Sequence, residues 1–132
     1  MAVSFVITTV KRTALANALN DDLDGGKLRI YSGASPGPNS AATGDLLADF
    51  TLPAKATNTV ANGVLTFGAI ANVNAAISGT AGYFRFLKSD LTVIADGNVA
   101  LSAATLNLSS LALVSGNPVS ITAFTITVPA GT

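Results

Sequence analysis

The segment KLRIYS, residues 27–32, sets the pattern of the chain, because its aliphatic residues occupy every second position. Leu28 and Ile30 share one side, while Arg29 and Tyr31 share the other, which is typical of a β strand with one buried face. Further stretches with strand-like composition follow at residues 46–52, 64–70, 82–88, 91–100, 104–108 and 118–128. Turn-forming residues separate these stretches and no long helix lies between them, so parallel βαβ winding is excluded as the main plan. The 132 residues therefore predict one mainly β domain, built as a sandwich or a barrel.

The N-terminal part of the chain differs from this pattern. Residues 10–20 place apolar side chains at roughly helical spacing, with Thr9 as the expected N-cap and Gly25-Gly26 closing the region. Residues 1–9 form a possible N-terminal arm.

No basic region precedes the apolar start, and no stretch approaches the roughly 18 apolar residues of a membrane helix. We expect a soluble protein made in the cytoplasm, with no membrane partner.

Residues 33–45 are predicted to form a long surface loop. The segment contains Pro36, Gly37, Pro38 and Gly44, which prevent regular strand pairing. Its length suits a functional arm, although a loop of this length is also tolerated at little thermodynamic cost. Both interpretations stay open at this point.

The last strand-like stretch, residues 118–128, contains an irregularity. Val119, Ile121 and Ala123 share one side, whereas the apolar residues Phe124, Ile126 and Val128 lie at the opposite parity. A strand cannot bury both sets on one face unless a bulge or a change of sheet lies between them. We therefore predict such a feature near Ala123-Phe124.

Two dipeptides, Asn62-Gly63 and Asp96-Gly97, have the composition of tight turns. Asparagine, aspartate and glycine adopt positive φ more readily than other residues. We expect the chain to reverse direction at both positions.

The composition argues against an enzyme. Seven Lys and Arg balance seven Asp, and the chain has no Glu, His, Cys or Trp. The commonest general base, the thiolate nucleophile and the usual zinc ligands are therefore missing, and no phosphate-binding glycine loop occurs. A net charge near zero gives no electrostatic footprint for nucleic acid. We expect no catalytic residue, no cofactor, no metal site and no nucleic-acid partner.

The acidic cluster of Asp21, Asp22 and Asp24 is the strongest candidate for an exception. Its spacing before Gly25 is similar to the start of a calcium loop. However, the downstream bidentate carboxylate is missing, since the next acidic residue is Asp45. We prefer a solvated turn that ends the helix.

The aromatic stretch Tyr83-Phe84-Arg85-Phe86 admits two interpretations. It could be a stacking platform for a sugar or a base. Phe84 and Phe86 lie at core parity, while Tyr83 and Arg85 face the other way, as in an ordinary strand. We prefer core packing of the two phenylalanines.

Four stretches in matching order resemble small virion proteins of tailed bacteriophages. Residues 26–33 with Pro36 are similar to an L-x-I-Y-x-G-x-x-P motif, and residues 44–48 to G-x-L-L-A. Residues 79–86 resemble G-T-A-G-x-F-R, and residues 116–128 resemble G-x-x-V-x-I-x-x-F-T-I. The resemblance covers roughly residues 15–129. One departure is Leu91, where the family pattern tends to have glycine after Asp90.

This resemblance implies a jelly-roll-like β-sandwich that acts as a capsid decoration, or cement, protein on the capsid exterior. The major capsid protein would be its partner, and the chain would form a homo-oligomer, a dimer or a trimer. The family brings no catalytic residues. The alternative function is a carbohydrate- or receptor-binding module of a tail structure, with exposed Tyr31 or Tyr83 as the stacking surface.

Overall fold

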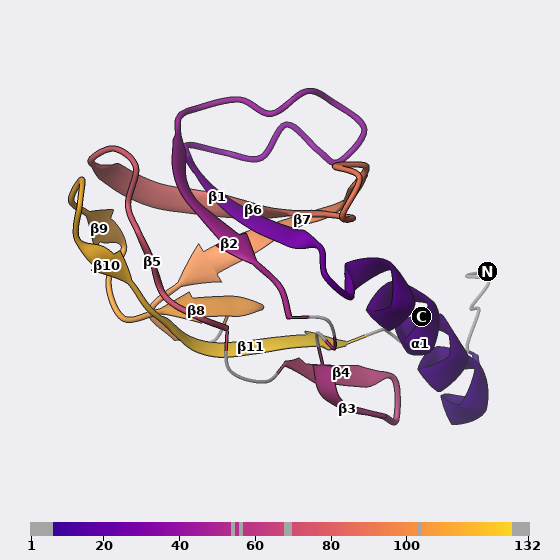
Figure 1. The fold of residues 1–132 in the computed structure, drawn as a ribbon. Coiled ribbons are helices and arrows are strands. Elements are labelled where there is room, and N and C mark those ends of the chain that lie inside the picture. Colours follow the sequence, from indigo (N-terminus) through magenta and orange to yellow (C-terminus); the bar gives the residue numbers. More distant parts are fainter. Residues whose placement is uncertain (1–6, 54, 56, 68–69, 103, 128–132) are drawn as a thin grey trace, which may run out of the picture.

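A computed structural model describes residues 7–53, 55, 57–67, 70–102 and 104–127 of the chain. It is mainly β, with a single α helix in this described part (Figure 1). The elements in chain order are α1 (Thr9–Leu23), β1 (Lys27–Ser32), β2 (Leu46–Thr51), β3 (Thr57–Ala61), β4 (Val64–Phe67), β5 (Val73–Asn74), β6 (Gly79–Leu87), β7 (Val93–Ala100), β8 (Leu106–Leu108), β9 (Ala112–Leu113), β10 (Pro118–Val119) and β11 (Ile121–Thr127). The mainly β class with one short N-terminal helix is confirmed.

The strands form one curled, open sheet and a small second sheet. The main sheet has the order β2-β1-β6-β7-β8-β11-β4-β3, and β9 adds to β6 outside this path. The second sheet pairs β5 with β10. The backbone N–H of Ala76, just after β5, donates to the carbonyl of Leu47 in β2 at 2.8 Å. The curl of the sheet thus brings β10, which directly precedes β11, close to β2 at the sheet's edge.

The concave side of the sheet contains the hydrophobic core. Leu28 and Ile30 of β1 and Phe84 and Phe86 of β6 are buried there, as their parity predicts. Four phenylalanine rings from three different strands pack together, with centroids 4.2–5.9 Å apart: Phe67, Phe84, Phe86 and Phe124. The aromatic stretch of β6 is therefore part of the core through its two phenylalanines.

Helix α1 is longer than the sequence indicates at both ends. Thr8, rather than the expected Thr9, is the N-cap, and its Oγ1 accepts a hydrogen bond from Lys11 N at 3.2 Å. The helix continues past Asn20 to Leu23, because Leu23 is fully buried against the sheet and keeps the last turn helical. No helix of the described residues is long and apolar enough to cross a membrane.

The C-terminal strand contains the predicted irregularity. Ile121 pairs with Leu108 and Ala123 with Asn107, so two steps on β11 correspond to one step on β8. This bulge at Thr122 lets Val119 and Phe124 both enter the core despite their opposite parity. The prediction of a bulge next to Ala123-Phe124 is confirmed.

One of the two predicted turns is correct. Asn62 and Gly63 have φ angles of 52° and 76° and connect β3 to β4. Asp96-Gly97 is wrong as a turn, since both residues lie within β7, opposite Arg85 and Phe84 of β6. A Cβ at residue 97 would collide with the Phe84 ring, so the glycine is required by packing against that ring.

Three strands were not expected from the sequence, namely β3, β5 and β9. Strand β3 has the largely polar sequence TNTVA, and β5 and β9 have two residues each. Their pairing with β4, β10 and β6 decides their conformation, which local composition does not indicate.

Candidate interaction loop

The loop of residues 33–45 lies beside the convex face of strands β1, β6 and β7 (Figure 1). It is irregular, as the sequence predicts, and it contains no charged side chain between Gly33 and Gly44. Its residues 38–45 are all exposed, whereas the strand side chains beneath it are buried. The loop therefore has a solvent-facing side and a side that is fixed to the sheet.

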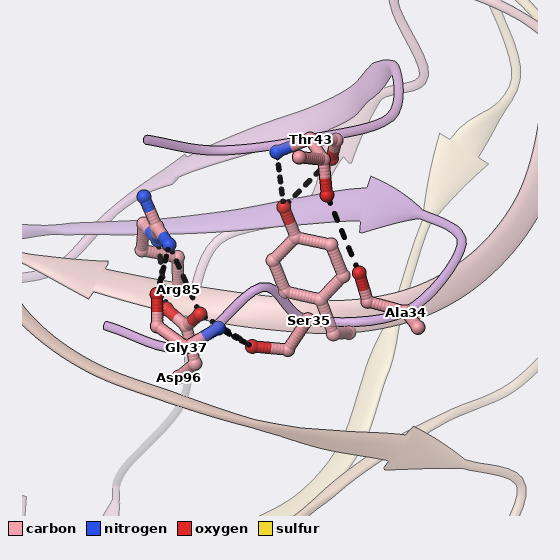
Figure 2. A network of polar contacts seen from close by, with 7 residues as sticks. Ala34, Ser35, Gly37, Thr43, Arg85 and Asp96 are labelled. Carbon is pink, nitrogen blue, oxygen red and sulfur yellow. Dashed lines mark hydrogen bonds and ion pairs between the residues drawn. The ribbon is translucent and has the colours of Figure 1, made fainter. Parts of the chain in front are cut away.

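Tyr83 of β6 holds the second half of the loop. Its hydroxyl donates to the carbonyl of Thr43 at 2.7 Å and accepts from the N–H of the same residue at 3.1 Å (Figure 2). The Tyr83 ring stacks on Tyr31 of β1, with centroids 5.2 Å apart. The Thr43 hydroxyl also donates to the carbonyl of Ala34 at 3.4 Å, which closes the loop on itself.

A buried ion pair holds the first half of the loop. Arg85 of β6 and Asp96 of β7 lie directly opposite each other in the sheet, with side chains 3% and 4% exposed. The guanidinium donates to both carboxylate oxygens, at 2.7 and 3.0 Å, and its Nη2 also donates to the carbonyl of Gly37 at 3.0 Å. Ser35 completes the network by donating to Asp96 at 2.5 Å and accepting from Gly37 N at 3.0 Å (Figure 2).

The electrostatics of this network favour its charged form. Burial alone would raise the pKa of Asp96, but hydrogen bonds from Arg85 and Ser35 outweigh it, so the pKa lies below the ordinary value. The hydrogen bond to Asp96 raises the pKa of Arg85 against the effect of its own burial. A carboxylate with a lowered pKa is a weak proton acceptor, and here it accepts the hydrogen bonds of Arg85 and Ser35. The network orders the loop.

The base of the loop is fixed by close backbone contacts. Ser32 N donates to the carbonyl of Asp45 at 3.1 Å, and Asp45 N donates to Ser32 Oγ at 2.9 Å. A Cβ at Gly82 would collide with the backbone of Gly33, so the glycine lets the loop start directly against β6. Together with the two buried anchors, this contact fixes the loop at its base, at Gly37 and at Thr43.

A row of charges crosses the convex face next to the loop. Asp49, Arg29, Arg85 and Asp96 occupy corresponding positions on β2, β1, β6 and β7. The two arginines are direct neighbours, and each has a carboxylate on its far side. Arg29 Nε lies 3.5 Å from Asp49 Oδ2, a longer and more exposed contact than the Arg85 pair. The row has no net charge, so it does not attract an anion by long-range electrostatics.

The acidic cluster of α1 is not assembled into a metal site. Asp22 Oδ1 lies 3.8 Å from Lys88 Nζ in an exposed contact. Within the described ranges, no group of three potential ligand side chains is close enough to hold a metal ion.

Tyr31 and Tyr83 differ from the expectation of exposed stacking aromatics. Both are buried, because they stack on each other beneath the loop. The sequence indicates that they face away from the core, but it does not reveal that residues 33–45 cover them. A sugar has no exposed tyrosine face to stack on in this conformation.

A recess of about 240 Å³ lies between residues 109–114 and 117–120. Serine, alanine, leucine, valine, asparagine and proline line it, and none of the lining side chains is ionisable. Its polar groups are serine hydroxyls, the asparagine amide and the backbone.

The comparison of the chain with protein-family models, curated proteins and solved structures finds no match. The features that bear on function are therefore loop 33–45, the side chains of Tyr83 and Arg85 that hold it, and its exposed side.

Proposed function

We propose that the chain is a structural virion protein of a tailed phage, a jelly-roll-like capsid decoration protein without enzymatic activity. The observation that carries this proposal is loop 33–45, which has no charged side chain between Gly33 and Gly44 and which two buried side chains hold at Thr43 and Gly37. The order of the four family-like sequence stretches supports the phage origin, and the low charge of the chain supports a role in protein contacts.

The physical reason concerns the entropy of binding. A flexible loop of this length loses conformational entropy when it docks. This loss costs a free energy of about 1–2 kcal/mol for each residue whose backbone is fixed. Here the bonds of Tyr83 and Arg85 order the loop before any partner arrives. A preordered loop thus binds with a smaller entropic penalty, which suits repeated docking on a lattice of identical capsid subunits.

The composition of the exposed side fits the same role. The exposed residues at positions 38–43 are Pro, Asn, Ser, Ala, Ala and Thr, which carry no charge to desolvate. Burying such a surface against another polypeptide avoids the cost of unpaired buried charges. On this proposal the loop contacts the major capsid protein.

Purified virions test this proposal directly. Mass spectrometry or gel densitometry should find hundreds of copies of the chain per particle, on the outside of the head. A handful of copies, or copies confined to the tail, would contradict the decoration role and favour the tail-module alternative.

A matched pair of variants tests the contribution of the loop. Tyr83→Phe removes the hydroxyl that holds Thr43, and we expect roughly tenfold weaker binding to particles that lack the protein, for a loss of about 1.4 kcal/mol. Tyr31→Phe is the control, since its hydroxyl has no hydrogen bond among the described residues although its ring stacks on Tyr83. Equal binding by the two variants would show that the ordered loop is not the contact element.

A further inference from the structure

The outward side of helix α1 carries apolar side chains among the polar Lys11, Asn17 and Asp21, and the described part of the protein leaves it uncovered. Val10 and Leu15 are 77% and 51% exposed, and Ala14 and Ala18 are exposed as well. Val10, Ala14 and Ala18 follow one another at a spacing of four residues, on the side opposite the buried Ala16. Figure 1 shows the helix at the side of the sheet, next to β3 and β4.

The charges of this helix oppose its own dipole. Lys11 and Arg12 lie near the N-terminal end, whereas Asp21 and Asp22 lie in the last turn. The N-terminal end of a helix favours negative charge and the C-terminal end favours positive charge, so the observed order is locally unfavourable. Among the described residues, neither Lys11 nor Asp21 forms an ion pair that would compensate for this order.

We propose that α1 is a self-association surface, on which a second copy of the chain packs its own α1 antiparallel across a two-fold axis. The antiparallel orientation places the basic end of each helix beside the acidic end of the other. With the axis near Ala16, Lys11 of one copy lies opposite the Asp21-Asp22 pair of the second copy, and the contact occurs twice by symmetry.

The side chains in the middle of the helix suit this arrangement. Ala14 of one copy meets Ala18 of the other, and these small side chains allow the two helix axes to approach to about 8–10 Å. Asp22 already contacts Lys88, but at 3.8 Å and with both side chains more than 40% exposed, so it can accept a second cation. The unfavourable charge order of one helix thus becomes a complementary charge pattern between two helices.

The size of the surface implies a weak dimer. A helix of 15 residues is about 22 Å long. The surface area that two such helices bury against each other is below the roughly 1,200 Å² buried in stable protein interfaces. The contact becomes significant at high local concentration, as on a particle surface. The proposal concerns the purified chain and does not depend on the capsid role, so the virion measurement and the following tests can fail separately.

Disulfide trapping tests the geometry, because the chain has no native cysteine. The variants Ala14→Cys and Ala18→Cys are oxidised mildly, each alone and as an equimolar mixture. In the antiparallel pair, residues 14 and 18 face each other, while identical residues are separated by about 6 Å along the axis. We expect the mixture to form covalent dimers several-fold faster than either variant alone.

Two other outcomes would overturn the proposal. Equal rates for the mixture and the single variants would exclude the antiparallel register. The absence of dimers in all three samples would show that α1 is not a self-association surface.

Charge reversal tests the electrostatic part by analytical ultracentrifugation. Lys11→Asp and the double variant Asp21→Lys with Asp22→Lys should each raise the dimer Kd about tenfold, because each creates a like-charge contact. Their equimolar mixture should recover dimerisation, since both contacts of the heterodimer are then complementary. Asp45→Lys changes the net charge by the same magnitude as Lys11→Asp, at an exposed site at the base of loop 33–45, and should leave the Kd unchanged. Failure of the mixture to associate better than the single variants would contradict the proposed contact.

Discussion

The ion pair of Arg85 and Asp96 makes two separable contributions, one to the stability of the fold and one to the order of the loop. Asp96→Asn keeps the shape of the side chain but leaves the Arg85 guanidinium, 3% exposed, without its counter-charge. Removing one partner of a buried pair costs about 3–5 kcal/mol. We expect about 3 kcal/mol, because the amide oxygen of asparagine can still accept one of the bonds from Arg85.

A double variant separates the two contributions. Arg85→Met with Asp96→Leu replaces the pair by apolar side chains of similar volume, which is often neutral for stability. The carbonyl of Gly37 then loses its donor, and the hydroxyl of Ser35 loses its acceptor. We therefore expect a double variant that is nearly as stable as the native chain but has a mobile first half of the loop.

Urea unfolding and hydrogen exchange measure the two effects. At an m value of about 2 kcal/mol/M, the single variant should lower the unfolding midpoint by about 1.5 M, and the double variant by less than about 0.5 M. The amide of Gly37 should exchange about tenfold faster in the double variant, while that of Thr43 stays protected by Tyr83. A midpoint within 0.2 M of native for Asp96→Asn, or unchanged exchange at Gly37 in the double variant, would refute this reasoning.

Three further predictions concern strain, packing and protonation. Leu91, a half-exposed residue at φ 70°, occupies a backbone region that costs a side chain about 1–2 kcal/mol, so Leu91→Gly should stabilise the protein by about 1 kcal/mol in thermal unfolding. Gly97→Ala should destabilise it by about 1–3 kcal/mol, because the new Cβ meets the Phe84 ring, and Phe84→Leu in the same chain should recover part of the loss in urea unfolding. The pKa of Asp96 is lower in the folded state, so its stabilising contribution is complete above the unfolded value of about 3.9 and is lost as the pH falls through the folded value. Urea midpoints measured between pH 6 and 2 should therefore decline less steeply for Asp96→Asn than for the native chain.

The sequence predicts the elements whose pattern is local. Strand β1 has the bounds that alternation indicates, residues 27–32, and the parity of β6 correctly assigns Phe84 and Phe86 to the core. The bulge in β11 is also predictable, because two apolar sets of opposite parity cannot share one face of a straight strand.

The same reasoning fails where a distant partner decides the conformation. Asp96-Gly97 resembles a turn by composition, yet cross-strand pairing with Arg85 and the ring of Phe84 place both residues in the middle of β7. Because the sequence predicts a turn at Asp96-Gly97, it does not indicate the ion pair between Arg85 and Asp96. Residue 96 lies opposite residue 85 because the register of β6 and β7 shifts between Phe86 and Leu87, and the sequence does not indicate this shift. Loop 33–45 covers the pair of Arg85 and Asp96, and only the three-dimensional structure reveals this contact.

The two proposed surfaces complement each other physically. On the two proposals, the loop contact would join the chain to a different protein, whereas the helix contact would join two identical copies across a two-fold axis. A two-fold contact closes on itself, so copies in solution stop at dimers and do not grow into fibres. If the loop holds each copy on a lattice, as proposed, the effective concentration of neighbouring copies rises, and a helix contact too weak to persist in solution becomes populated. The two contacts then stabilise each other, because dissociation of one copy requires both to break at once.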